Sequence, residues 1–348
     1  MHKKKFKGWS YFTPARFYRI AFILCVVLLS GCASVGERIC IEHRAAFDIG
    51  SATMKMKTAK VDKCRETSIE IIGQKEVKVS FAENTRNNLL SRDIQNIGIE
   101  QLKILRKEAM TQGAQTFAGV ATAAFRQANN TPQFLAEIKA ETGISVRMIS
   151  QDEEAVLGYK AATANTKNPS ENIVVWDIGG HSMQMIMKGR DQNYRVYRGR
   201  LASLSFKNQI IEKIQRRAVD RQASPNPIGR QNLTAALEIT MNAAADVPDE
   251  IKNYIRQAGA TIIGIGGVHN QSVRKQVGKN SAYRREDLAN ALKDKLDLND
   301  IQIGGHYADT DVSNLILVLG FMKKLDIEEV HLADVNLTDG ILIDPAFW

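Results

Sequence analysis

The 348-residue chain has few residues that break regular structure and few cysteines. It holds 24 Gly and 7 Pro, so its composition gives no sign of a long disordered region. Its four Cys and six His lack zinc-type spacing, and no Ser-His-Asp signature of an α/β-hydrolase is present. What remains is the composition of a globular chain, 44% apolar and 24% charged, with enough residues for two domains.

Acidic residues are absent from positions 1–31, which carry six Lys and Arg ahead of an apolar run at 20–29. The run is short for a membrane span and ends in small residues, so we interpret residues 1–31 as a signal peptide. Leu29-Ser30-Gly31-Cys32 resembles a bacterial lipobox, which predicts cleavage before Cys32 and lipidation of its thiol. We expect an exported bacterial lipoprotein that faces the periplasm and is held in a lipid membrane through Cys32. The outer membrane is favoured over the inner one, and an uncleaved anchor is the alternative.

The net charge of +9 falls once the signal peptide is set aside, because 41 Lys and Arg then remain against 38 Asp and Glu. A nearly neutral chain carries no general attraction for polyanions. We therefore expect no nucleic-acid partner.

Export would place Cys40 and Cys64 in an oxidising compartment. Strands expected at 43–49 and 54–61 would form an antiparallel hairpin with its turn near residue 52. Opposite residues in such a hairpin share one index sum, here about 104, and Cys40 and Cys64 have that sum. We predict a Cys40–Cys64 disulfide across the base of the hairpin, with two free buried thiols as the alternative.

One pattern of strands and turns occurs twice in the chain. Phe47-Asp48-Ile49-Gly50-Ser51 and Trp176-Asp177-Ile178-Gly179-Gly180 each follow a buried strand and precede another. Helical spacing is expected at 205–219 and 230–256 in the second copy. We predict a tether at 32–42, a first domain at 43–165 and a second at 166–348, whose C-terminal helix could pack back on the first. The linker is expected at 165–171.

The turns after these strands have the chemistry of a phosphate site. Glycine lets backbone N–H groups approach an anion, and a neighbouring aspartate can hold Mg²⁺ that bridges to phosphate oxygens. Ile263-Gly264-Ile265-Gly266-Gly267 supplies a third turn of this kind. Each turn alone is more simply a tight connection between strands, but the three together favour a metal–phosphate site.

Five stretches of the chain carry a resemblance to a known family. They are residues 46–51, 120–128, 149–155, 175–180 and 339–342. Over roughly residues 43–345 the chain resembles the exopolyphosphatase / guanosine pentaphosphate phosphohydrolase (Ppx/GppA) family of the actin-like ATPase superfamily. The resemblance implies an α/β fold with duplicated actin-like (ribonuclease H-like) domains and a cleft between them.

The family's activity would be the Mg²⁺- or Mn²⁺-assisted removal of a terminal phosphoryl group from polyphosphate or a guanosine penta- or tetraphosphate. By resemblance, Glu154 matches the catalytic glutamate and Arg126 the arginine that contacts phosphate. Three further positions match metal-holding ones: Asp48, Asp177 and Gln184. The implied phosphate-binding residues are Gly50, Ser51, Gly179, Gly180, Ser182, Gly266 and Gly267.

The three turns also depart from the family's pattern, at Ala52, His181, Met183, Gln184 and Val268. His181 replaces a glycine that lets backbone approach phosphate, and it would lie near His269 if both turns face one cleft. These changes leave two alternatives open, a phosphohydrolase or a non-catalytic phosphate-ligand sensor on the same fold. A homodimer is also left open. We expect the extra helical C-terminal domain of longer members to be absent, which favours small substrates.

Overall fold

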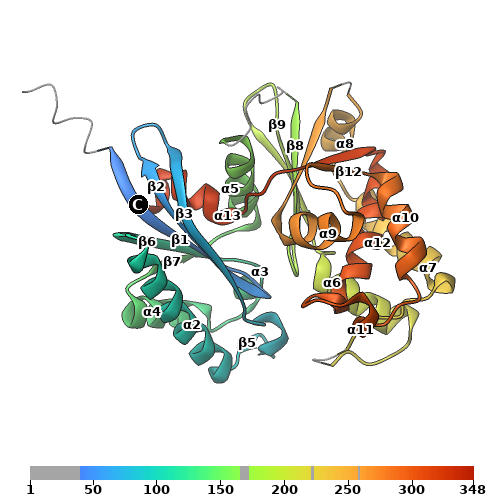
Figure 1. Cartoon of the computed structure of the whole chain (residues 1–348), viewed down its shortest axis with the longest axis horizontal. Coiled ribbons are helices and arrows are strands. Elements are labelled where there is room, and N and C mark those ends of the chain that lie inside the picture. The colour runs from blue at the N-terminus through green and yellow to red at the C-terminus, as the bar shows by residue number, and fades with distance from the viewer. Residues whose placement is uncertain (1–39, 165–171, 221–222, 258) are drawn as a thin grey trace, which may run out of the picture.

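The computed structural model describes residues 40–164, 172–220, 223–257 and 259–348. Cys32, the signal-peptide segment and the linker candidate therefore lie outside the described residues. Two sheets stand side by side, each covered by helices (Figure 1). None of the helices in the described ranges is long and apolar enough to cross a membrane.

The first sheet has the strand order β3-β2-β1-β6-β7. An antiparallel meander of β1 (Ile41–Ile49), β2 (Thr53–Asp62) and β3 (Thr67–Lys78) is extended by β6 (Thr116–Ala121) and β7 (Ser145–Met148), both in the direction of β1. Between β3 and β6 lie a 3₁₀ turn and a small ribbon, and the helices follow in chain order. The elements before β6 are the turn Ala82–Asn84, β4 (Thr85–Arg86), β5 (Leu89–Leu90) and α2 (Arg92–Thr111), and α3 (Ala123–Gln127) and α4 (Thr131–Thr142) lie between β6 and β7.

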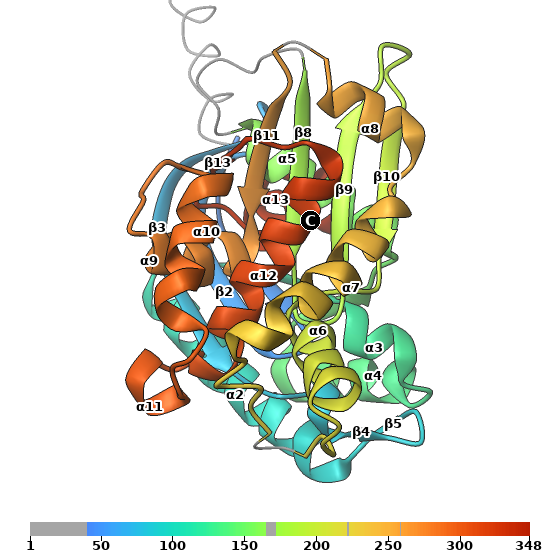
Figure 2. The same cartoon turned by 90° about the vertical axis from the view of Figure 1, so that its right-hand side faces the viewer.

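The second sheet repeats this arrangement. Its order is β10-β9-β8-β11-β13-β12, and its first five strands have the order and directions of the first sheet. The strands are β8 (Ile173–Ile178), β9 (Met183–Lys188), β10 (Tyr194–Gly199), β11 (Thr261–Ile265), β12 (Ala282–Arg284) and β13 (Glu329–Leu332). Figure 2 shows α7, α10 and α12 in front of these strands. The helices are α6 (Ser203–Gln209), α7 (Leu233–Ala245), α8 (Asp249–Ile255), α9 (Arg274–Val277), α10 (Arg285–Lys295), α11 (Asp300–Ile303) and α12 (Ala308–Leu325).

Strand alternation decides which face of each sheet the aspartates occupy. On β1, Phe47 and Ile49 pack in the core formed with α2 and α4, whereas Ala46 points to the opposite face. Asp48 shares the face of Ala46. On β8, Val175 packs toward α5 (Gln151–Ala164), and Asp177, two residues on, shares that face. Both aspartates therefore lie on the sheet face that meets α5.

Helix α5 packs between the two sheets. Leu157 belongs to the core with β1, β2 and β6, while Ala155, Ala161 and Ala162 belong to the core with β8 and β11. A Cβ atom on Gly158 would lie 2.9 Å from the Ile265 side chain, so glycine permits the close approach. The two halves are thus held against one shared helix.

Helix α13 (Leu337–Ile343) returns the chain to the first sheet. Its Gly340 meets the backbone of Leu157 so closely that a Cβ there would clash. Lys57 Nζ and Asp339 Oδ2 form a buried ion pair at 2.7 Å, and Arg44 Nη1 donates to the Leu342 carbonyl at 2.8 Å. The helix is therefore fixed to the first sheet by packing and by charge.

Several element boundaries differ from the expectations. The hairpin register pairs Ile41 with Asp62, an index sum one lower than expected, because the turn after Ile49 is one residue tighter. The helix expected at 205–219 ends at Ile214, since Arg216 has a positive φ of 58°. The helix expected at 230–256 is broken before Asp249, because Pro248 cannot continue the α7 hydrogen bonds.

Cys40 and Cys64 form a disulfide with their Cα atoms 5.4 Å apart. Cys64 lies just beyond β2, where its N–H donates to Asp62 Oδ1 at 3.0 Å. That position brings its sulfur to the start of β1 despite the shifted register. The disulfide ties the entry of the chain into the first sheet to the β2–β3 turn.

Removing this disulfide should destabilise the fold. It closes a loop with a sequence separation of 24 residues, and loop-closure entropy at that length is worth about 2–4 kcal/mol. We expect the Cys40→Ser/Cys64→Ser variant of the full chain to lose that much free energy of unfolding in urea titrations. Dithiothreitol should lower the wild type to the same level and leave the variant unchanged; equal unfolding midpoints for variant and oxidised wild type would contradict the prediction.

Candidate active site

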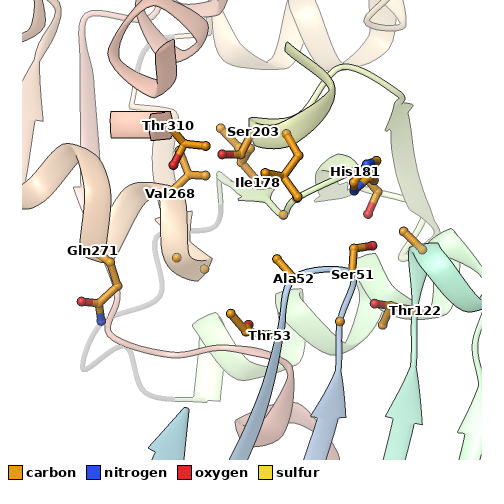
Figure 3. Close-up of a pocket in the computed structure, with 18 of the residues that line it drawn as sticks. Ser51, Ala52, Thr53, Thr122, Ile178, His181, Ser203, Val268, Gln271 and Thr310 are labelled. Atoms are coloured by element: carbon orange, nitrogen blue, oxygen red, sulfur yellow. The ribbon is translucent and has the colours of Figure 1, made fainter. Parts of the chain in front are cut away.

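A cleft between the two sheets is lined by the turns that follow β1, β6, β8, β11 and β13 (Figure 3). Two of these turns have the same geometry. Gly50 N–H donates to the Thr53 carbonyl at 2.9 Å, and Gly179 N–H donates to the Ser182 carbonyl at 2.9 Å. The tips nearly touch, since a Cβ on Gly180 would lie 3.7 Å from that of Ser51. The structure brings every implied phosphate-binding residue into the lining: Gly50, Ser51, Gly179, Gly180, Ser182, Gly266 and Gly267.

Asp48, Glu154 and Asp177 are three of the acidic residues that line this cleft. Asp48 and Glu154 are 7% and 5% exposed, and Asp177 lines the cleft beside them. Burial raises the pKa of all three groups, and repulsion by a neighbouring carboxylate adds to the effect: Glu76 acts on Asp48, Asp48 on Glu154, and Glu154 on Asp177. For Asp177 burial, reinforced by Glu154, raises the pKa to about 7. The cleft therefore concentrates negative charge that a cation would relieve.

Lys55 supplies one such cation, and the sequence analysis missed it. Strand register places Asp48, Lys55 and Glu76 in one row across β1, β2 and β3, so the three side chains share a face. Burial alone would lower the pKa of Lys55, but the surrounding carboxylates, Asp48 foremost, raise it. Lys55 is thus a charged ammonium in the cleft. The register expected from the sequence pairs Lys55 with Ile49 and so places it on the face opposite Asp48, whereas the observed register pairs it with Asp48.

Glu154 is positioned by the first turn of α5 and by Arg126. Arg126 Nη1 donates to Glu154 Oε2 at 2.8 Å and to the Ile149 carbonyl at 3.1 Å. Ser182 Oγ approaches Glu154 Oε1 at 3.5 Å. Arg126 does not line the cleft among the described residues, so the structure places its guanidinium on the glutamate. Its direct contact with phosphate stays a prediction.

The neighbouring Glu153 explains why Glu154 is the one that faces the cleft. Glu153 Oε2 accepts the Ser150 N–H at 2.9 Å, which satisfies a free donor at the start of α5. That contact holds Glu153 at the exposed helix end. The next residue, about 100° further around the helix, then points inward.

The donor set fits a hard divalent cation. Asp48 Oδ1 is buried and has no hydrogen-bond partner within the described chain, and carboxylate oxygens are the ligands that Mg²⁺ or Mn²⁺ prefer. Gly266, with φ +81°, leaves room for Asp177, because a Cβ at that position would clash with the Asp177 carboxylate. Gln184 is 1% exposed and lies outside the cleft lining, so its role as a ligand stays a prediction.

The altered positions fall in different surroundings. Ala52, His181 and Val268 line the cleft, whereas Met183 is fully buried in the core of the second sheet. His269 is also fully buried, with Nδ1 2.6 Å from Tyr283 Oη, and burial lowers its pKa to about 3. The structure therefore does not bring His269 to His181 in the cleft.

Comparisons with known proteins agree with this architecture. The model of a family described as the Ppx/GppA phosphatase family matches residues 60–346. A guanosine-5'-triphosphate,3'-diphosphate pyrophosphatase of Photobacterium profundum is 24% identical over 310 residues, which cover 86% of this chain and 58% of the relative. The chain thus spans well under two thirds of that relative's length.

Solved structures show the same fold. A PPX-GPPA enzyme of Aquifex aeolicus superposes with a TM-score of 0.67 at 18% identity, covering 87% of this chain and 99% of the other. An exopolyphosphatase of Cytophaga hutchinsonii gives 0.67 at 16% identity, covering 86% and 96%. The expected duplicated actin-like α/β fold is confirmed.

The raised pKa of Asp177 predicts a pH-dependent cost to stability. Its ordinary pKa is 3.8, against about 7 in the fold. The proton it retains favours the folded state below pH 3.8, and this contribution is lost as the pH rises through 7. In thermal unfolding with EDTA, we expect Asp177→Asn to melt above the wild type at pH 8, by a margin that shrinks toward pH 4. Asp294→Asn, at an exposed site on α10, is the control; a margin that does not grow with pH contradicts the prediction.

Proposed function

The chain belongs to the Ppx/GppA phosphatase family, and from that premise we propose that it hydrolyses the terminal phosphoanhydride bond of inorganic polyphosphate or of a guanosine penta- or tetraphosphate. The observation that carries the proposal is the Glu154 carboxylate, held by Arg126 inside a cleft walled by three glycine-rich turns. The names of the relatives support both substrate classes, since one is called a guanosine-phosphate pyrophosphatase and another an exopolyphosphatase.

Glu154 is the base of the proposed reaction. Burial raises the pKa of its carboxyl group, which strengthens it as a proton acceptor, while Arg126 keeps one oxygen fixed. The carboxylate takes a proton from a water molecule as that water attacks the terminal phosphorus. The bond to the bridging oxygen breaks, and the shortened phosphate chain leaves with the electron pair. Arg126 acts through Glu154 and is a positioning residue.

The negative charge of the substrate must be balanced in the same cleft. Lys55 provides a positive charge in the cleft. The glycine-rich turns at residues 50–53, 179–182 and 266–267 line the same space, where backbone N–H groups that are not used within the turns would bind phosphate oxygens. Asp48 and Asp177 would hold Mg²⁺ or Mn²⁺, which would neutralise charge developing on phosphate oxygens.

The placement of Glu154 favours hydrolysis over binding alone. A buried carboxylate beside a phosphate site repels an anionic ligand and loses its own hydration, so it weakens simple binding. Three carboxylates in the cleft multiply that cost. A site that only bound phosphate would gain from neutral donors at these positions.

We further propose that the chain is exported and anchored in a lipid membrane through Cys32. The signal-like segment and the lipobox resemblance support this proposal. The Cys40–Cys64 disulfide supports it independently, because disulfides persist mainly in oxidising compartments.

Replacing Glu154 tests the proposed reaction. With Mg²⁺ and polyphosphate or a guanosine tetraphosphate, the wild type should release inorganic phosphate, and Glu154→Gln should reduce the rate roughly 10²–10⁴-fold because the base is lost. Glu153→Gln changes the adjacent carboxylate, which lies at the helix end, and should retain most of the rate.

Two outcomes would contradict the proposed reaction. Ligand binding without phosphate release by the wild type would exclude the hydrolase and favour the sensor. An equal loss in Glu153→Gln and Glu154→Gln would show that the effect comes from the helix start rather than from the base.

Mutation of Cys32 tests the anchor. Expressed in a bacterium with labelled palmitate, the wild type should incorporate label and appear in the membrane fraction without residues 1–31. Cys32→Ser should lose the label, whereas Cys25→Ser should keep it, because Cys25 belongs to the removed segment. Mass analysis showing an unmodified Cys32 joined to residues 1–31 would contradict the proposal.

A further inference from the structure

His181 occupies the tip of the second phosphate turn, in the place that Ala52 holds in the first. The matching Gly50–Thr53 and Gly179–Ser182 hydrogen bonds establish that equivalence. In Figure 3 its ring lies across the cleft from Ser51 and Thr122. Its Nδ1 atom is buried and has no hydrogen-bond partner among the residues that the structure describes. An enclosed polar atom of this kind calls for a partner, and the cleft is where a ligand would supply one.

The cleft continues past His181 into a second cavity of about 630 Å³. His181, Glu83 and Leu204 line both spaces. The walls of this side cavity come from the segment 82–86 of the first half and from α6 of the second. It is therefore a continuation of the cleft toward solvent between the two halves.

Among the described residues two cations line the side cavity, and only one of them is free of an ion pair. Lys207 is 4% exposed and paired with Asp309 at 3.0 Å, so its charge is already compensated. Arg86 on β4 is exposed and forms no ion pair within the described ranges. Arg86 is the free guanidinium of this cavity, and its planar fork suits phosphate oxygens.

Elsewhere in the cleft a hydrogen bond joins the two halves. Tyr307 Oη, just before α12, donates to Glu76 Oε1 on β3 at 3.0 Å, and this bond joins the two halves. A chain-like substrate whose terminal phosphate lies at Glu154 can therefore extend past His181 without breaking an interdomain hydrogen bond. Both partners of that bond line the cleft but not the side cavity.

We propose that His181 and Arg86 form a second phosphate subsite, which binds the phosphate next to the scissile bond in a linear phosphoanhydride substrate. The inference rests on the proposed function. It adds the direction in which the substrate extends from Glu154 and the residues that recognise its next phosphates. His181 Nδ1 donates to a phosphoryl oxygen, which fixes the tautomer with the proton on that nitrogen. Arg86 binds the following phosphate oxygens from the opposite wall.

The neutral form of His181 suits this role. Burial lowers the pKa of its imidazole, and the charge of Lys207 adds to that effect, while Glu83 opposes it. The ring then acts through one N–H group rather than through charge. Glu83 lines both the cleft and the side cavity, and its repulsion should weaken the binding of an anion there.

Chain-length dependence tests the subsite. The test uses the Glu154→Gln full chain, which should bind without turnover, and calorimetric titration with tripolyphosphate and with inorganic phosphate in Mg²⁺. Adding His181→Leu or Arg86→Gln should weaken tripolyphosphate binding roughly tenfold, since each removes a hydrogen bond to a charged group. Inorganic phosphate binding should change less than about twofold.

Three further variants make the result specific. His181→Asn keeps a donor near the Nδ1 position and should retain most of the affinity for tripolyphosphate. Glu83→Gln should tighten tripolyphosphate binding, because it removes a repelling charge. Arg65→Gln, an exposed cation in the β2–β3 turn, should change nothing. Thermal unfolding of each variant checks that it is folded.

The outcomes separate this inference from the proposed function. Equal affinity for tripolyphosphate in the parent, His181→Leu and Arg86→Gln proteins overturns the subsite and leaves the hydrolase in place. Parallel losses for both anions overturn it too, because they would show a general disturbance of the cleft. A folded parent that binds neither anion overturns the proposed function and, with it, the subsite.

Discussion

The packing of α5 between the two sheets is the constraint on which the site depends. Its first turn carries Glu154, while its two sides pack against β1, β2 and β6 and against β8 and β11. The aspartates reach the same cleft because each lies on the strand face that meets this helix. A slip of one residue in β1 or β8 would turn Asp48 or Asp177 to the opposite face. Gly158 permits the close packing of α5 against β11, and Gly340 permits the close packing of α13 against α5.

That packing imposes an electrostatic cost at the same place. Burial of Asp48, Glu154 and Asp177 raises the pKa of each, and neighbouring carboxylates add to the effect, so the fold works against their ionisation. Lys55 and Arg126 offset part of the repulsion. The remainder makes the cleft receptive to a cation, and a cation bound there makes it receptive to phosphate. Reactivity and lost stability thus arise from one arrangement of charges.

The sequence predicted what local rules decide. Strands β1, β2, β8 and β9 lie where the repeated motif predicts them, and the turn residues Gly50 and Gly179 follow β1 and β8 as expected. The residues and contacts that the sequence did not predict depend on strand register and on contacts between residues far apart in the chain. Lys55 required a register correct to one residue. The Arg126–Glu154 and Tyr307–Glu76 contacts join residues 28 and 231 positions apart, which no local pattern specifies.

The departures from the family pattern change the structure of the turns less than the sequence indicates. The turn hydrogen bonds at Gly50 and Gly179 are formed by backbone atoms, so neither Ala52 nor His181 disturbs the shape of its turn. Met183 contributes to the core and Val268 to the cleft wall. What His181 changes is the chemistry at the tip, where an imidazole replaces bare backbone. A backbone N–H binds any phosphate oxygen within reach, whereas a ring held in one orientation selects the direction from which the oxygen comes. In the proposed subsite the altered turn therefore transfers part of phosphate recognition from the main chain to a side chain, beside an unchanged Glu154.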